Sequence, residues 1–442
     1  MKQQKEALFH DGSSQFCKYN EKSDTYTFIL RTTIGAVNQA FMAIDGYEMK
    51  MSHVDTKGRF DYYAINLALG TKMIKYHFRT VGQYRLYYNV FGASEHFSEE
   101  WEFEFTPGFK TPDWAKGAVM YQIMVDRFNN GDKSNDVMTN EYAYIGRGVS
   151  KVENWMEPPA VDGTRQFYGG DLQGVIDKLE YLEKLGVEVI YFNPIFVSPS
   201  NHKYDTQDYD YIDPHFGKIV NDNGKLLEDG DNNNEHAQRY KVRTTDLANL
   251  EASNKLFVEL VEKAHAYGIK IIIDGVFNHC GSFNKWMDKE KFYTKNKNYK
   301  SGAYISKDSP YNLYFKFLED RWPDNNSFEG WWGFDTLPKL NYEGSKELCD
   351  YIIEVGKKWV SPPYNVDGWR LDVAADLGHS QEFNHEFWKK FRKAVKEANP
   401  EAIILAEHYG DANSWLQGDQ WDTIMNYDGF MDPVTWFLTG VD

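Results

Sequence analysis

The stretch Asn365-Val-Asp-Gly-Trp-Arg-Leu-Asp372, followed by Val-Ala-Ala-Asp376, decides the fold prediction. It is a short, partly apolar run that contains an Arg and an Asp two residues apart and leads into a segment with helical spacing. In a strand, residues two apart point to the same face, so Arg370 and Asp372 should emerge side by side. A cation beside a carboxylate favours the ionised form that a nucleophile requires. Taken alone, the stretch fits a structural ion pair equally well, so the flanking sequence has to be considered.

The sequence on both sides of this stretch alternates between apolar runs and helical segments. The predicted strands are 118–124, 187–192, 269–274, 365–372, 402–406 and 421–425, and the predicted helices are 172–185, 254–267, 346–360 and 381–398. Repeated strand–helix units indicate a parallel sheet. We therefore predict an α/β fold of the (β/α)8-barrel type for this part of the chain.

Polar residues collect where the predicted strands end: Asp274 with Asn278 and His279, Arg370 with Asp372, and Glu407. The C-terminal strand ends carry the chemistry of a (β/α)8 barrel. A retaining glycosidase needs two carboxyl groups about 5 Å apart, one as nucleophile and one as general acid/base. Acidic residues also cap helices that follow strands, but the agreement of three strand ends favours catalysis.

Residues 1–112 have a different pattern, in which polar and apolar residues alternate. This period of two is clear at 25–31, 73–79 and 100–105, and turn residues separate the runs. We predict an N-terminal antiparallel β-sandwich, joined to the rest by the Pro- and Gly-containing linker 106–112. The sandwich could bind carbohydrate, bind a partner subunit or simply pack; packing alone is favoured.

Composition narrows the class of partner. The 442-residue chain has a net charge of −17, which argues against nucleic acid or an anionic membrane. Aromatic residues make up 16% of the chain and suit stacking on sugars. The first ten residues lack the apolar core of a signal peptide, and no apolar run is long enough for a membrane span. Cys17, Cys280 and Cys349 have no paired spacing and indicate reduced thiols in a cytosolic protein.

From Trp114 onward the chain resembles the α-amylase family of glycoside hydrolases. The resemblance is carried by Asp274-Gly-Val-Phe-Asn-His279, Gly368-Trp-Arg-Leu-Asp-Val373, Leu405-Ala-Glu-His408 and Leu337-Pro-Lys-Leu-Asn341. The last motif is similar to a signature of the neopullulanase, cyclomaltodextrinase and maltogenic amylase group, in which a β-sandwich also precedes the barrel. Each motif is weak alone, but their combination is specific.

The resemblance implies a role for each matching residue. Asp372 corresponds to the nucleophile, Glu407 to the general acid/base, and Arg370 to the residue that keeps Asp372 ionised and oriented. Asp274 and His279 would contact the sugar and support the floor of subsite −1. The aromatic residue that stacks under this sugar corresponds to Tyr204, and His408 would contact the substrate on the +1 side. In the group, a Gly more often precedes the acid and an apolar residue or Trp follows it, so the +1 preference stays open.

The resemblance also divides the chain. It implies the first part of the barrel at 113–280, an inserted loop domain at 281–340 and the remainder of the barrel at 341–442. Trp322 and the pair Trp331-Trp332, inside the loop domain, would line the cleft or fill a core. The family's third acid, in a His-Asp pair after the seventh strand, is not found, and strands seven and eight are unaccounted for. We therefore expect a partial chain with an open sheet edge.

Two further segments are rich in Asn, Asp and Gly. Asn130, Asp132, Asn135, Asp136, the Gly169 carbonyl and Asp171 resemble a calcium site of the group, which would tie the loop after the first strand to the next helix. A polar turn with a helix cap at Asp171 is the alternative. Residues 217–246 resemble an insertion, for which a solvated loop is favoured over a rim for long glucans or a second metal site.

The favoured function is hydrolysis of α-1,4 bonds in maltodextrins, cyclodextrins or pullulan with retention of configuration. Because a sugar hydroxyl can replace water in the second step, transglycosylation is compatible with the same residues. One alternative is a chain that lacks the third acid and is therefore inactive, either a glucan-binding protein or a fragment. Another is a glucanosyltransferase with little hydrolysis. The expected partners are an α-glucan and, through the N-terminal domain, a second copy of the chain.

Overall fold

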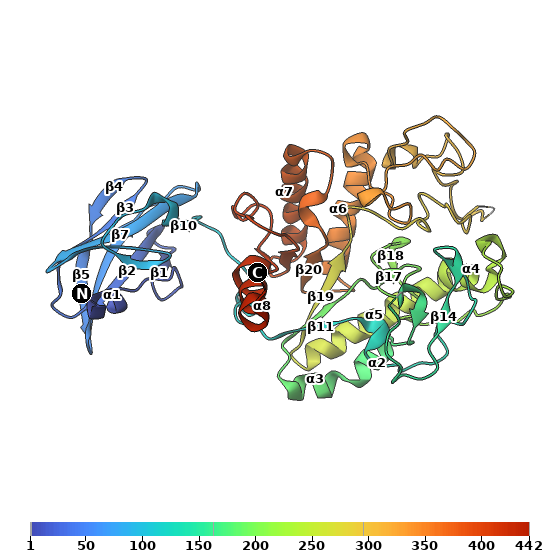
Figure 1. Ribbon diagram of the computed structural model, residues 1–442, viewed down its shortest axis with the longest axis horizontal. Helices are drawn as coiled ribbons and strands as arrows, with labels where there is room; N and C mark the ends of the chain where they lie inside the picture. Colours follow the sequence, from blue (N-terminus) through green and yellow to red (C-terminus); the bar gives the residue numbers. More distant parts are fainter. Residues whose placement is uncertain (1, 162, 295, 442) are drawn as a thin grey trace. The chain divides into compact units, whose positions relative to one another are not determined.

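The computed structural model describes residues 2–161, 163–294 and 296–441, so Met1, Asp162, Lys295 and Asp442 lie outside it. Two of these, Met1 and Asp442, are outer limits of the predicted domains. The chain forms two compact units, Met1–Lys110 and Thr111–Asp442, which are described separately (Figure 1). The described helices include none that is long and apolar enough to cross a membrane.

The first unit consists of two antiparallel sheets that follow a short helix, α1 (Lys2–Ala7). The four-stranded sheet has the order β1 (Cys17–Asn20), β2 (Thr25–Thr33), β6 (Phe60–Leu67), β5 (Ser52–Lys57). The other has the order β4 (Tyr47–Lys50), β3 (Val37–Ile44), β7 (Ile74–Gly82), β8 (Arg85–Asn89), β9 (Gly92–Ser94), and β10 (Phe103–Phe105) also pairs with β7. Alternate residues of β2, β3 and β7, such as Phe28, Met42 and Phe78, form the buried core. The predicted β-sandwich is confirmed.

One strand of this unit is shorter than its pattern predicts. The alternation at 100–105 continues through Glu99–Trp101, but these residues form a 3-10 turn, and only β10 pairs with β7. Alternation of polar and apolar residues predicts a half-buried strand. The alternation does not show whether a neighbouring strand is available for pairing along all of residues 100–105.

The second unit is built on a parallel sheet whose strands lie in chain order. These are β11 (Met120–Ile123), β16 (Val189–Phe192), β19 (Lys270–Gly275), β20 (Gly368–Leu371), β21 (Ile403–Ala406) and β22 (Thr423–Ile424). Each is parallel to the next. The predicted parallel sheet of the (β/α)8-barrel type is confirmed for six strands within the described ranges.

Most helices of this unit lie between successive strands of the sheet along the chain and account for the distance in sequence between these strands. The helices are α2 (Leu172–Asp177), α3 (Leu179–Leu185), α4 (Gln238–Thr245), α5 (Leu247–Ala266), α6 (Lys346–Val360), α7 (Gln381–Ala398) and α8 (Asp432–Thr439). In Figure 1, α6 and α7 flank the strands β19 and β20. Their apolar faces place Trp359, Trp388 and Phe391 in the core shared with the sheet.

Two helix predictions differ from the structure for local reasons. The segment 172–185 is broken into α2 and α3 at Lys178, whose backbone leaves the helical region. Helix α5 starts earlier than predicted, at Leu247, because the Asp246 side chain accepts a hydrogen bond from the backbone N–H of Ala248 and so caps the helix. The C-terminal limit of α3 is as predicted, with Gly186 in the left-handed conformation at φ 86°.

Half of the segment 217–246 is exposed, but buried residues anchor it. Leu227 packs in a cluster with Tyr142, Tyr240 and Phe283. Asn234 donates to the backbone carbonyl of Ala143 and accepts from its N–H, both at 2.8 Å. The predicted solvated loop is therefore wrong for these positions, because they are part of the packed interior of the second unit.

Candidate active site

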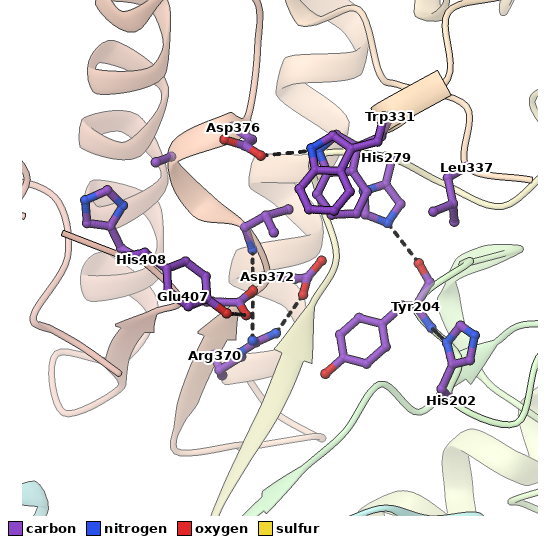
Figure 2. Close-up of a pocket in the computed structure, with 14 residues that line it drawn as sticks. His202, Tyr204, His279, Trp331, Leu337, Arg370, Asp372, Asp376, Glu407 and His408 are labelled. Carbon is purple, nitrogen blue, oxygen red and sulfur yellow. Dashed lines mark hydrogen bonds and ion pairs between the residues drawn. The ribbon is translucent and has the colours of Figure 1, made fainter. Parts of the chain in front are cut away.

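A pocket of about 640 Å³ opens at the C-terminal ends of β19, β20 and β21 (Figure 2). Six residues predicted for the site line it: Tyr204, His279, Arg370, Asp372, Glu407 and His408. Asp274, the seventh, is fully buried behind the pocket and contacts Arg370. The parallel strand ends thus bring together side chains that are far apart in the sequence.

Arg370 lies at the centre of three carboxylates. Its Nη1 donates to Asp372 Oδ1 at 2.9 Å and to both oxygens of Asp274 at 3.1 Å. Its Nη2 lies 2.9 Å from Glu407 Oε2. Figure 2 shows Arg370 extending toward Asp372 and Glu407. The pairing of Arg370 with Asp372, predicted from their spacing in the strand, is confirmed, and one guanidinium aligns the carboxylates of two adjacent strand ends.

The charge balance of the pocket involves more groups than the predicted pair of Arg370 and Asp372. Burial raises the pKa of Asp372 well above its usual range, and the nearby carboxylates of Asp274 and Glu407 add to this effect. Arg370 opposes the rise but does not cancel it. Burial also raises the pKa of Asp274. As predicted, Arg370 favours the ionised form of Asp372, but it does so against burial and the two further carboxylates of Asp274 and Glu407.

Glu407 has one engaged oxygen and one more open oxygen. Its Oε2 accepts from the backbone N–H of Val373 at 2.9 Å and pairs with Arg370. Among the described residues, its Oε1 accepts a hydrogen bond only from the phenolic hydroxyl of Tyr409, at 3.2 Å. The ring of Tyr409 stacks on Tyr427, with centroids 4.3 Å apart. Oε1 is consequently the oxygen of Glu407 that can exchange a proton with a bound molecule.

Tyr204 and His279 form one wall of the pocket. The Tyr204 hydroxyl donates to Asp274 Oδ2 at 3.2 Å, and the Arg370 guanidinium lies 6.0 Å from its ring centroid. His279 Nε2 donates to the Tyr204 carbonyl at 3.2 Å, so its Nδ1 is free to accept from the Asn278 amide. Burial lowers the pKa of His279 to about 3, which keeps the imidazole neutral. In this structure His279 fixes the Tyr204 backbone.

Aromatic residues of the loop domain line the pocket mouth. The Trp331 ring stacks on His279 at 4.8 Å with an interplanar angle of 8°, and Trp332 stacks on Trp331 at 4.7 Å. Trp332 is 79% exposed. The choice left open between cleft and core is settled as cleft for these two. Trp322 lies outside the pocket lining, where its indole N–H donates to the Ala303 carbonyl and its ring packs on Phe317.

Beyond Trp331 and Trp332, which were candidates for the cleft, the pocket is lined by residues that the sequence did not identify as site residues, namely His202, Leu337, Val373, Ala375, Asp376 and Tyr409. Most flank a predicted site residue within a few positions, and Leu337 and Val373 also belong to the motifs that carry the family resemblance. His408 is more anchored than expected. Its Nε2 donates to the Asp411 carbonyl at 3.1 Å, and its ring packs on Trp415 and Trp421.

The predicted calcium ligands come together in one loop cluster. Asn130 Nδ2 donates to Asp136 Oδ1 at 2.7 Å, and a Cβ on Gly169 would lie 2.4 Å from the same oxygen. The side-chain oxygens of Asn130 and Asn135 are buried without a hydrogen-bond partner. The described residues contain no cluster of three or more His, Cys, Asp or Glu side chains that could hold a metal ion, so such a site would depend on amide and main-chain oxygens.

The two remaining predicted ligands are otherwise engaged. Asp171 caps α2, and its oxygens accept from the backbone N–H groups of Gly131, Asp132 and Gly174 at 2.6 to 3.0 Å. Asp132 Oδ2 accepts from Lys218 Nζ at 2.7 Å. The cap at Asp171, which the sequence offered as the alternative, is confirmed. Asp136 Oδ2 also pairs with Lys151 Nζ at 2.8 Å, so a cation held by Asn130, Asn135, Asp136 and the Gly169 carbonyl would compete with this lysine.

Comparison with known proteins identifies the class to which this fold and pocket belong. Residues 122–234 and 246–437 match the family described as "Alpha amylase, catalytic domain", and residues 1–112 match "Alpha amylase, N-terminal ig-like domain". The chain belongs to the α-amylase family.

Individual relatives extend over both units. The chain is 35% identical to a cyclomaltodextrinase of Thermoanaerobacter pseudethanolicus (strain ATCC 33223 / 39E), covering 96% of this chain and 65% of the relative. It is also 35% identical to neopullulanase 2 of Thermoactinomyces vulgaris, covering 98% and 66%. The solved type III pullulan hydrolase from Thermococcus kodakarensis superposes with a TM-score of 0.60 and 26% identity, covering 95% and 64%. The chain thus spans just under two thirds of the length of these relatives.

Proposed function

We propose that the chain provides the nucleophile and the general acid/base of a retaining α-glucan hydrolase. Its substrates would be the α-1,4 bonds of maltodextrins, cyclodextrins or pullulan. The observation that supports this most directly is the placement of Asp372 and Glu407, from adjacent strand ends, on the two terminal nitrogens of Arg370. The names of the relatives, cyclomaltodextrinase and neopullulanase, support this substrate class.

The reaction follows from the two carboxyl groups. Asp372 attacks the anomeric carbon while Glu407, protonated on its open Oε1, gives that proton to the leaving glycosidic oxygen. The C1–O bond breaks and a glycosyl ester forms on Asp372. Glu407 then takes a proton from water, which attacks C1 and releases Asp372, so the two inversions give net retention. A sugar hydroxyl in place of this water gives transglycosylation.

The excess of negative charge favours this chemistry. Three carboxylates share one guanidinium, so the ionised site carries a net negative charge. The transition state for glycoside cleavage resembles an oxocarbenium ion and is positively charged. A site that is under-neutralised before the reaction stabilises this charge as it develops. Tyr204 and the exposed Trp332 add apolar faces against which sugar rings can stack.

The proposal is tested by incubating the 442-residue protein with γ-cyclodextrin and maltoheptaose and measuring reducing ends, with proton NMR of the first-formed anomer. Release of the α-anomer from maltoheptaose supports the proposal, and release of the β-anomer contradicts it. Calorimetric titration of the same sample separates the alternatives. Glucan binding without bond cleavage would favour a non-catalytic binding protein, and transfer products without free sugar would favour a transferase.

We also propose a structural calcium ion held by Asn130, Asn135, Asp136 and the Gly169 carbonyl. Support comes from the buried, unpartnered oxygens of both asparagines and from the close approach of Gly169 to Asp136. The ion would be a partner for the unpartnered side-chain oxygens of Asn130 and Asn135, and it would connect the loop 130–136 to Gly169. Its position outside the pocket lining assigns it no part in bond cleavage.

Removing calcium is expected to lower the melting temperature. At a free concentration of about 100 Kd, binding would stabilise the folded chain by about 2.7 kcal/mol. The measurement is thermal unfolding in EDTA and after calcium is added back, for the wild type and for Asp136→Ala. The wild type should respond and the variant should not. The matched control is Asp132→Ala, whose side chain pairs with Lys218 and should leave the response in place. Equal melting with and without calcium would contradict the site.

Two further features of the whole protein are proposals. The three cysteines are free, which supports a reducing compartment such as the cytoplasm. Pairing of two copies through the first unit is supported by the exposed aromatic pair Phe91 and Trp101, whose ring centroids lie 4.2 Å apart. Sedimentation equilibrium of the wild type and of a Phe91→Ser variant tests the pairing.

A further inference from the structure

The turn that presents Tyr204 to the pocket contains a conformation that needs support. Lys203, between the pocket residues His202 and Tyr204, has a φ of 60°. This left-handed region is unfavourable for a residue with a Cβ and a long side chain. Such a conformation persists only where the surrounding contacts enforce it. The contacts of Lys203 are therefore the first place to look for what shapes this wall of the pocket.

The Lys203 side chain points into the protein and is fully buried. Its Nζ donates to Asp213 Oδ2 at 2.6 Å and to the Ser198 carbonyl at 3.0 Å, and it lies 4.5 Å from the centroid of the Phe216 ring. Only 1% of the lysine side chain and none of the aspartate side chain is exposed. The main chain of Lys203 is held as well, because its N–H donates to Ser200 Oγ at 2.9 Å.

Asp213 is itself fixed from two sides. Its Oδ2 also accepts from the Ser198 N–H at 3.0 Å, and its Oδ1 accepts from the backbone N–H and the Nδ1 of His215 at 2.8 and 2.9 Å. The other ring nitrogen of His215 lies 2.7 Å from Glu141 Oε1, and Glu141 pairs with Arg243 at 2.8 Å. Charges of alternating sign thus continue from Lys203 into the interior.

The opposite side of the turn is engaged with the catalytic groups. The Tyr204 N–H donates to His202 Nδ1 at 3.2 Å, its carbonyl accepts from His279 Nε2, and its hydroxyl donates to Asp274. A change in the backbone at Lys203 would therefore move the stacking ring and the His279 contact together. The two peptide units of the 202–204 turn therefore connect the buried Lys203–Asp213 ion pair with the pocket.

We propose that Lys203 is a positioning residue whose buried ion pair with Asp213 holds the 202–204 turn, so that Tyr204 presents its ring to a bound sugar. The inference depends on the proposed glucan substrate. Replacing a buried ion pair by apolar side chains is often neutral for stability. A fully buried lysine at this point is therefore better explained by the conformation that it imposes than by the stability that it contributes.

The test compares Lys203→Met with Lys285→Met in the full chain. Lys285 forms a second lysine–aspartate pair, 2.7 Å from Asp208, and does not line the pocket. Two quantities are measured: maltoheptaose affinity by calorimetry, and hydrogen exchange of the peptide covering 198–206 by mass spectrometry. We expect Lys203→Met to bind about tenfold more weakly and to exchange faster at 198–206, whereas Lys285→Met retains wild-type affinity and wild-type exchange in this peptide.

The two readouts separate the inference from the proposed function. If the wild type binds no glucan, the proposed substrate is wrong, but faster exchange confined to Lys203→Met still supports the positioning role. Unchanged exchange at 198–206 in a folded Lys203→Met protein overturns the inference. If this variant does not fold, Lys203→Met combined with Asp213→Asn leaves no unpaired charge at this pair and is measured instead. Wild-type affinity and wild-type exchange in the double variant would also overturn the inference.

Discussion

Replacing Asp372 by Asn is expected to abolish glucan cleavage while leaving the fold and the pocket intact. The amide has nearly the same shape as the carboxylate and can still accept the hydrogen bond from Arg370 Nη1. It cannot form the glycosyl ester, so kcat should fall by at least about 10³-fold, as for the loss of other catalytic nucleophiles. Initial rates on maltoheptaose, measured beside its calorimetric Kd, separate lost chemistry from lost binding.

The same substitution should make the protein more stable at neutral pH. The pKa of Asp372 is raised in the folded state, mainly by burial, so the folded chain binds this proton more tightly than the unfolded chain. Stability linked to Asp372 is therefore greatest below its unfolded pKa of about 4 and decreases as pH rises toward the folded value. Asn has no such titration. Asp372→Asn should melt a few degrees higher at pH 7 than the wild type, by about 2–4 °C, and equally at pH 3.5 to 4.

A matched control keeps these two effects apart. Asp376 lines the pocket and accepts a hydrogen bond from the indole N–H of Trp331 at 3.2 Å. The carboxylates paired with Arg370 are instead those of Asp274, Asp372 and Glu407. Asp376→Asn should therefore retain turnover within about tenfold and show no pH-dependent gain in melting temperature. Turnover by Asp372→Asn at the wild-type rate would exclude Asp372 as nucleophile. A lower melting temperature at neutral pH would contradict the charge balance deduced for the pocket.

The sequence was informative where function depends on strand periodicity. Arg370 and Asp372 share a strand face, and Asp274 and Glu407 lie at the ends of the two parallel strands that flank this strand on either side, so their convergence could be expected from spacing alone. The roles of these groups came from the resemblance to a family. The net charge effect could not be predicted from pairs of residues, because it depends on how many buried carboxylates one arginine has to neutralise.

The parts that escaped prediction belong to irregular segments. The sequence left Trp331 and Trp332 open between cleft and core, because they lie in a 3-10 turn of the loop domain, where no periodicity indicates which face is buried. Tyr409 follows Glu407 in a loop, and its contact with Glu407 depends on the stacked ring of Tyr427, eighteen positions further on. No pattern in the sequence singled out Lys203. Its burial follows from the path of the chain between β17 (Phe196–Val197) and β18 (Asp208–Ile212), which the sequence pattern did not contain.

Removing the charge of Arg370 is expected to have the largest effect on stability. Its side chain is 4% exposed and is shared by Asp274, Asp372 and Glu407. In Arg370→Met these carboxylates lose their common cation, and breaking a buried ion pair from one side costs about 3–5 kcal/mol. Chemical unfolding at several pH values measures the loss. It should be largest at neutral pH and shrink toward pH 4, where protonation removes the repulsion among the carboxyl groups.

Arg370→Lys separates charge from geometry in the same experiment. A lysine restores one positive charge but not the planar fork that contacts three carboxylates at once. We therefore expect Arg370→Lys to recover much of the stability at neutral pH, while kcat stays at least about 10²-fold below the wild type because Asp372 and Glu407 are no longer aligned. Arg392→Met is the control for loss of an arginine away from the pocket, since Asp422 keeps a second cation in Lys396. A pH-independent loss in Arg370→Met would mean that packing, rather than the three carboxylates, makes Arg370 indispensable to this fold.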